Sequence, residues 1–130
     1  MEEKKIIIAD DMILTVGAPT TAGSKMLDGY NSLFEAEALT RLKAAGYQLG
    51  GKADVGEFAI DLLGETSYKG ALISEGKIKN AAAEAIKSND AIAALCLDVN
   101  GSVRRAAAQS GLVSLKATYG TISRYGTVPV

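Results

Sequence analysis

Residues 97–105, LDVNGSVRR, have the types and spacing that could support chemistry. They follow the apolar run AIAALC and precede the alanine-rich stretch AAAQSG, so we expect Ser102 at the turn from a buried strand to a helix. At such a turn backbone N–H groups can bind an anion, and a serine hydroxyl can serve as a nucleophile. Serine is also a frequent helix N-cap, so the segment has a purely structural interpretation as well.

The composition limits how Ser102 could be activated. There is no histidine among the 130 residues, which excludes a Ser-His-Asp triad, a Cys-His pair and most zinc sites within one chain. The single cysteine, Cys96, lies in an apolar run, where we expect a buried free thiol in a reducing compartment. A net charge of −1 gives no electrostatic argument for binding nucleic acid or an anionic membrane surface, and no stretch is long enough to span a membrane. We therefore expect a cytoplasmic protein with no nucleic-acid or membrane partner.

The elements that must position this segment alternate between apolar runs and helical patterns. Strands are expected at residues 4–10, 47–53, 91–98, 112–116 and 121–126. Helices are expected at residues 32–45, 54–63, 78–90 and 102–111, the first starting with a capping box of Ser32 and Glu35. This alternation predicts an α/β domain with a largely parallel sheet, and nothing in the sequence divides residues 1–130 into two domains.

Five stretches, taken in order, resemble the amidase signature family. They are TTAGSKML (residues 20–27), RLKAAG (41–46), GKADVGEFA (51–59), ETSYKG (65–70) and DVNGSVRRAAAQSGLVSLKATYGTISRYG (98–126). The resemblance extends over residues 6–130 and implies a three-layer α/β/α fold around a mixed, largely parallel sheet. Full-length members continue far beyond the last motif, so we expect residues 1–130 to form a single truncated domain, an amidase-signature-like half-core.

The resemblance also implies a mechanism, because members of this family hydrolyse or transfer amides with a Ser-cisSer-Lys triad. Matched position by position, the nucleophile falls on Ser102. The same match places an oxyanion loop, whose backbone N–H groups would stabilise the transition state, and three supporting residues. The loop residues are Val99, Asn100, Gly101 and Ser102, and the supporting residues are Asp11, Asp98 and Arg104. We expect Arg104 to pair with Asp98.

Two members of the triad are replaced in this sequence. Asp10 stands at the position of the family's lysine, and Gly76 falls at the position of its cis-serine. A carboxylate with an ordinary pKa of about 4 is a weak base for a serine hydroxyl at neutral pH. Its negative charge would also oppose an oxyanion forming nearby. We therefore expect a catalytically degenerate, amidase-like module for binding or scaffolding, without a cofactor.

Other functions stay open. Ser102 could be the nucleophile of a residual serine amidase or esterase, with Lys77 or Lys79 as a new base. The chain could also be half of a split enzyme, with a second polypeptide supplying the missing amidase half. Because half of a sandwich leaves a strand edge and an apolar face uncovered, we expect a homo-oligomer, most simply a dimer.

Ligand binding at the turn has its own alternatives. Asp10, Asp11 and Asp98 could meet at one edge of the sheet and hold Mg²⁺ or Ca²⁺. Solvated or capping aspartates are the preferred interpretation, and we expect no metal. The NGS turn could also bind a phosphate or sulfate weakly.

Overall fold

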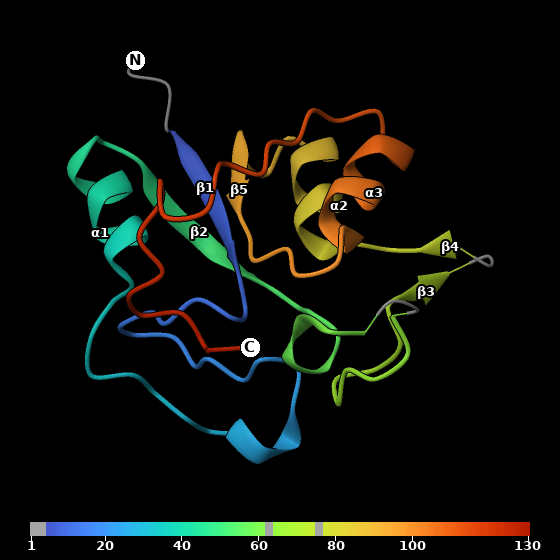
Figure 1. Cartoon of the computed structure of the whole chain (residues 1–130), viewed down its shortest axis with the longest axis horizontal. Coiled ribbons are helices and arrows are strands. Elements are labelled where there is room, and N and C mark those ends of the chain that lie inside the picture. Colours follow the sequence, from blue (N-terminus) through green and yellow to red (C-terminus); the bar gives the residue numbers. More distant parts are fainter. Residues whose placement is uncertain (1–4, 62–63, 75–76) are drawn as a thin grey trace.

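Three parallel strands form the centre of the molecule (Figure 1). The computed structural model describes residues 5–61, 64–74 and 77–130. The strands are β1 (Ile6–Asp10), β2 (Gln48–Ala53) and β5 (Ala93–Leu95), in the order β2-β1-β5. The middle strand is an apolar, mostly β-branched run whose Ile7 and Ala9 are fully buried, as expected for a strand paired on both sides. This central sheet is therefore entirely parallel in its described strands, not mixed.

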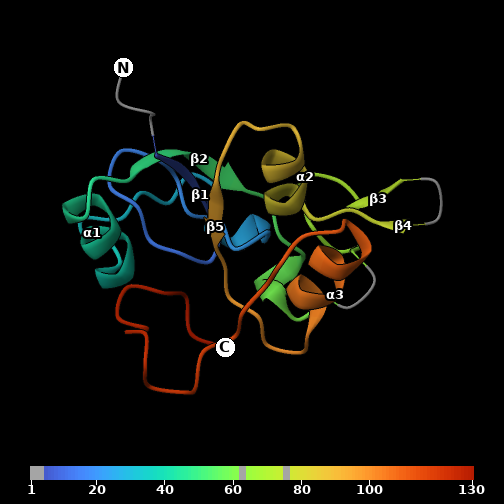
Figure 2. The same cartoon turned by 90° about the horizontal axis from the view of Figure 1, so that it is seen from above.

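Helices lie on both sides of these strands. They are α1 (Glu37–Ala44), α2 (Ala81–Lys87) and α3 (Ser102–Gln109), with two 3₁₀ turns, η1 (Lys25–Leu27) and η2 (Glu57–Ala59), and a small antiparallel hairpin of β3 (Ile73–Ser74) and β4 (Lys77–Ile78). Figure 2 shows α1 on one side of the strands and α2 and α3 on the other. Of the helix expected at 54–63, the described part, residues 54–61, contains only the single turn η2, and residues 62–63 lie outside the described residues. Within the described residues no helix has the length and apolar character needed to cross a bilayer.

The start of α1 differs from the capping box expected at Ser32. The Ser32 hydroxyl instead accepts the N–H of Phe34 at 3.2 Å in a local turn, and Glu35 pairs with Lys43 at 2.5 Å. The helix begins after Ala36, whose N–H donates to a loop carbonyl 3.0 Å away. The first helical N–H, that of Glu37, donates to the carbonyl of Tyr125, so a distant part of the chain takes over part of the role of a side-chain cap. Its buried face joins the core, which consists of Ile7, Ala9, Ile13, Ala36 and Leu39.

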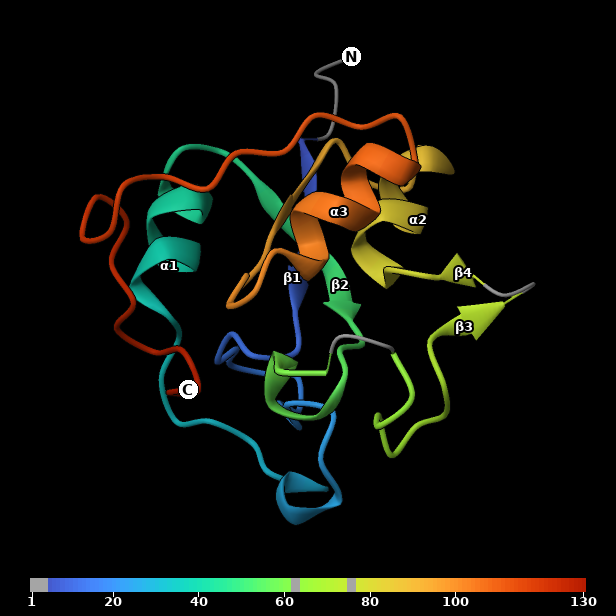
Figure 3. The same cartoon turned by 45° about the vertical axis from the view of Figure 1, so that its right-hand side comes forward.

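The carboxyl-terminal segment, residues 112–130, contains neither of the two strands expected there. Figure 3 shows it crossing from α3 over the strands to α1. It is anchored near its end, where the carbonyl of Gly126 accepts the N–H of Leu14 at 2.9 Å and the N–H of Val128 donates to Met12 at 2.8 Å. A strand needs a hydrogen-bonded neighbour, and the backbone of residues 113–117 bonds to no other described residue. The segment therefore has the apolar pattern of a strand, but no described strand pairs with it.

Candidate functional site

The turn before α3 carries Ser102, but this serine is not the helix cap. Gly101 occupies the N-cap position with a left-handed φ of +90°, which a glycine adopts without strain, and Ser102 is the first helical residue. The Ser102 hydroxyl hydrogen-bonds to no described residue. The expected capping role of Ser102 is therefore wrong, because another side chain already supplies the acceptor.

That acceptor is Asp98. Its carboxylate accepts the N–H of Gly101 at 2.6 Å, the N–H of Arg104 at 3.2 Å and the Arg104 guanidinium at 2.7 Å. The predicted Arg104–Asp98 pair is thereby confirmed. Burial by itself would raise the pKa of Asp98, but the hydrogen bonds from Arg104 and Gly101 outweigh it and hold that pKa below its usual range. A charged carboxylate at a helix N-terminus also interacts favourably with the helix dipole.

Two N–H groups of the expected oxyanion loop already donate to side chains of the same turn. The N–H of Gly101 donates to Asp98, and the N–H of Ser102 donates to the Asn100 side chain at 3.2 Å. An anion binding at this turn would have to displace these acceptors and approach the Asp98 carboxylate. The structure also brings in Lys116, whose ammonium donates to the carbonyl of Asp98. Nothing in the local sequence indicated Lys116, because it lies beyond α3.

Asp10 lies at the end of β1 and is 2% exposed. One carboxylate oxygen accepts the N–H of Met12 at 3.0 Å, and the other accepts the N–H of Leu97 at 2.6 Å. Asp10 thus ties the end of β1 to the residue that leads into the Asp98 turn. Burial raises the pKa of Asp10 to about 7, against the lowering effect of these two hydrogen bonds and of Lys52.

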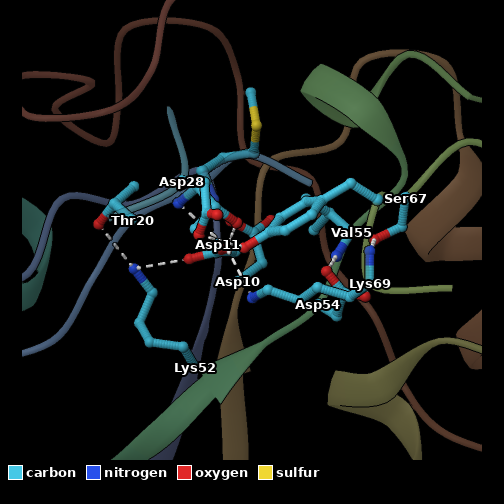
Figure 4. Close-up of polar contacts among 12 residues, drawn as sticks. Asp10, Asp11, Thr20, Asp28, Lys52, Asp54, Val55, Ser67 and Lys69 are labelled. Atoms are coloured by element: carbon cyan, nitrogen blue, oxygen red, sulfur yellow. Dashed lines mark hydrogen bonds and ion pairs between the residues drawn. The ribbon is translucent and has the colours of Figure 1, made fainter. Parts of the chain in front are cut away.

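Asp11 faces two lysines that the sequence pattern did not single out (Figure 4). Its oxygens lie 3.5 Å from the Lys52 ammonium and 3.3 Å from that of Lys69, and it also accepts the N–H of Thr21 at 3.1 Å. In the register of the sheet Lys52 pairs with Ala9, one residue before Asp10. The position of Lys52 near the carboxyl end of a predicted strand, the usual ligand edge of an α/β sheet, was the available signal.

The Lys52 ammonium is fully engaged. It donates to the carbonyl of Ile13 and to the hydroxyls of Thr15 at 2.7 Å and Thr20 at 3.1 Å, in addition to its pairing with Asp11. Burial lowers the pKa of Lys52, although the charge of Asp11 opposes that shift. All four partners belong to the connection that follows β1, so this lysine organises that loop.

The remaining sequence candidates are separate from this cluster. Gly76, at the cis-serine position, and the side chain of Lys77 lie outside the described residues. Lys79 is exposed, and its N–H donates to the carbonyl of Leu72 at 2.5 Å. Cys96 is a free thiol that is half-buried rather than buried, and burial followed by nearby carboxylate charges raises its pKa.

The three aspartates considered as a cation site do not form one. Among the residues that the structure describes, no group of three or more acidic, cysteine or histidine side chains could hold a metal ion. Each carboxylate has a different set of partners: backbone N–H groups for Asp10, lysines and a threonine for Asp11, and the α3 N-terminus for Asp98.

The parallel sheet and its flanking helices make this an α/β protein, and a glycine-serine turn begins its last described helix. The sequence model of the family described as Amidase matches residues 7–130, so the chain belongs to that family. It is 41% identical over 129 residues to the A-subunit of glutamyl-tRNA(Gln) amidotransferase from Symbiobacterium thermophilum, covering 94% of this chain and 26% of the relative. The corresponding protein of Halobacterium salinarum is also 41% identical, with 94% and 30% covered.

A solved structure gives the same result. The crystal structure of the glutamyl-tRNA(Gln) amidotransferase A-subunit from Thermotoga maritima matches with a TM-score of 0.78 at 35% identity. That match covers 95% of this chain but 29% of the Thermotoga chain. The chain therefore spans between a quarter and a third of the length of these relatives.

Proposed function

We propose that this chain is a catalytically degenerate amidase fragment that acts as a binding or scaffold module in the cytoplasm. One observation carries the proposal: both oxygens of Asp10, at the position of the family's lysine, accept backbone N–H groups in a buried setting. A residue held in this way is committed to structure, and its carboxylate gives the serine turn no strong base. The likeness to the amidotransferase proteins supports a related three-layer fold.

The nearby lysines do not compensate for Asp10. Lys52 and Lys69 contact groups of residues 11–20, and neither contacts the turn at residues 99–102. The N–H donors of that turn are already satisfied by Asp98 and Asn100. Neither a base nor a preorganised oxyanion site is therefore assembled around Ser102.

A fluorophosphonate serine probe tests the proposal directly. We expect no covalent labelling of the folded wild-type chain by intact mass after hours of incubation. The Ser102→Ala variant should give the same spectrum. Stoichiometric labelling of the wild type that disappears in Ser102→Ala would show an activated nucleophile and overturn the proposal.

A residual serine amidase or esterase is the second candidate, and one observation favours it. The Ser102 hydroxyl has no hydrogen-bond partner among the described residues, and the Lys116 ammonium reaches the neighbouring carbonyl of Asp98. If the wild type is labelled, Lys116→Ala should abolish labelling, whereas Lys79→Ala serves as the matched control. In that case Lys116 would be the replacement base.

A further inference from the structure

Asn100 and Gly101 form the one asparagine-glycine pair in the sequence, and they lie in the turn that begins α3. The other three asparagines, Asn31, Asn80 and Asn89, precede residues that carry a side chain. Asparagine is a thermolabile residue, because the backbone nitrogen of the next residue can attack its side-chain Cγ. The attack is easiest when the next residue is glycine, which has no Cβ to obstruct it.

The surroundings of this pair leave room for that reaction. Asn100 is exposed, and a Cβ added at Gly101 would contact only the Arg104 guanidinium, at 3.5 Å. The Asn100 side chain accepts the N–H of Ser102 at 3.2 Å and donates to the carbonyl of Ile60 at 3.4 Å. Both hydrogen bonds are exposed to water, which can replace them at little cost. The side chain is therefore free to turn towards the Gly101 nitrogen.

The Gly101 N–H, which must lose its proton before the nitrogen can attack, is held by Asp98. It donates to the Asp98 carboxylate at 2.6 Å. Hydrogen bonds from Arg104 and Gly101 hold the pKa of Asp98 below its usual range, so the carboxylate is charged at neutral pH. Removing the amide proton would leave two negative charges facing each other, which Coulomb repulsion disfavours. This charge-assisted hydrogen bond therefore keeps the nitrogen unreactive.

We propose that Asn100 is a deamidation site and that the Asp98–Gly101 hydrogen bond sets its rate. When that hydrogen bond opens, hydroxide takes the Gly101 amide proton and the nitrogen forms a bond to Cγ of Asn100. The Cγ–Nδ2 bond breaks, and Nδ2 leaves as ammonia with a proton from water. A water molecule then opens the resulting succinimide at either carbonyl, which gives aspartate or isoaspartate.

Either product would change the start of α3. A carboxylate at position 100 lies two residues after Asp98 and repels it, and it has no proton to donate to the carbonyl of Ile60. Isoaspartate also inserts the Cβ into the main chain directly before the N-cap residue Gly101. The modification would thus loosen the turn that carries Ser102, whether or not that serine is reactive.

Peptide mapping by mass spectrometry tests the proposal. The purified chain is incubated at neutral pH for several weeks, and deamidation at residue 100 is measured in the folded chain and in urea. Asp98→Ala should deamidate about tenfold faster than the folded wild type, because it loses a charge-assisted hydrogen bond. The wild type in urea should also react faster than the folded wild type. The matched control is Asp90→Ala, which removes an exposed aspartate outside the turn and should react at the wild-type rate.

A second control separates the hydrogen bond from the stability of the helix. Ala108→Gly weakens α3 at an exposed position but keeps Asp98, so its rate should stay close to that of the wild type. If circular dichroism shows that Asp98→Ala does not fold, Asp98→Ser replaces it, because serine keeps a capping hydroxyl without the charge. That variant should still deamidate faster than the wild type.

Three outcomes would overturn this inference. The first is no deamidation at residue 100 in urea over the same period. The second is a folded Asp98 variant that reacts no faster than the wild type, or no faster than Ala108→Gly. The third is a gain in deamidation that maps to Asn31, Asn80 or Asn89 instead.

Discussion

At the residue scale, Asp10 and Asp98 do the same structural work in opposite electrostatic settings. Each carboxylate accepts two backbone N–H groups, those of Met12 and Leu97 for Asp10 and those of Gly101 and Arg104 for Asp98. Asp98 also has the Arg104 guanidinium, which keeps its pKa low, whereas burial raises the pKa of Asp10 to about 7. The two residues should therefore respond to pH in different ranges.

The raised pKa of Asp10 predicts that the free energy of unfolding falls as the pH rises. In the folded state its pKa is about 7, against roughly 4 when unfolded, so between these values the folded chain keeps a proton that the unfolded chain has lost. Stability from this group is fully present below about pH 4 and is lost as the pH rises through 7. Relative to Asp10→Asn, the wild type should lose about 2–3 kcal/mol of unfolding free energy between pH 5 and pH 8, measured by urea denaturation.

The control for this pH series is Asp90→Asn, which changes an exposed aspartate. Its stability difference from the wild type should stay constant across the same range. Because the pKa of Asp98 is lowered, that residue loses its contribution only below about pH 4, outside the window. A pH-independent difference between the wild type and Asp10→Asn would contradict the assignment.

The N-terminus of α3 gives a second prediction at this scale. Asp98→Ala removes the acceptor for two backbone amides and should cost about 1–2 kcal/mol, as for loss of a helix cap. Ser102→Ala should change the unfolding free energy by less than about 0.5 kcal/mol, because its hydroxyl has no described partner. Equilibrium urea unfolding of both variants at pH 7 compares them. A larger loss in Ser102→Ala than in Asp98→Ala would restore Ser102 as the cap.

At the scale of elements, the carboxyl-terminal segment supports the loop after β1. Residues 126–128 hydrogen-bond to Leu14 and Met12, and the carbonyl of Tyr125 accepts the first helical N–H of α1 at 3.1 Å. Phe34 and Tyr125 pack with ring centroids 5.4 Å apart. The end of the segment is therefore structural, while its first part, at residues 113–117, is exposed.

Gly126 is the tightest point of this contact. Its φ is +81°, and an added Cβ would lie 2.5 Å from the Cα of Ala36. Gly120 has a similar φ of +87° with open space around it. Gly120→Ala should cost about 1 kcal/mol from backbone strain alone, whereas Gly126→Ala should cost about 3 kcal/mol because the segment must also move from α1. Equal losses in thermal or urea unfolding would show that this contact does not form.

At the scale of the whole molecule, three short parallel strands are covered unevenly. The core cluster lies towards α1, while apolar surface lines an open cavity between β5, α2, α3 and residues 112–124. The homodimer expected from the sequence stays a prediction, which the size of the purified chain tests.

Hydrogen exchange of the purified chain should differ between the covered and the open parts of the molecule. The amides of β1, paired on both sides, should be the most protected, and those of residues 113–117 should exchange at nearly unprotected rates. Leu14 and Val128 are internal controls, because their amides join the anchored end of the segment to the loop that follows β1. Protection at residues 113–117 in a monomer would contradict the described arrangement.

Local sequence was sufficient to predict the elements that have a clear pattern of their own. The apolar run of β1 and the alanine-rich α2 and α3 could be predicted from composition and periodicity, and the family resemblance added the Asp98–Arg104 pair. The order of motifs also identified the family, which the match over residues 7–130 confirms.

Tertiary structure alone decided the rest. Residues 112–116 have strand propensity but lack a partner, and strand formation depends on that partner. Lys52 acquired its role from Asp11 and from hydroxyls more than thirty residues away in the chain. The capping of α3 is a local contact that the sequence prediction gave to Ser102, but the partly buried Asp98 carboxylate, paired with Arg104, is a stronger acceptor than that hydroxyl. For residues 112–116 and for Lys52, the deciding contact, missing or present, is one between distant parts of the chain that no local pattern encodes.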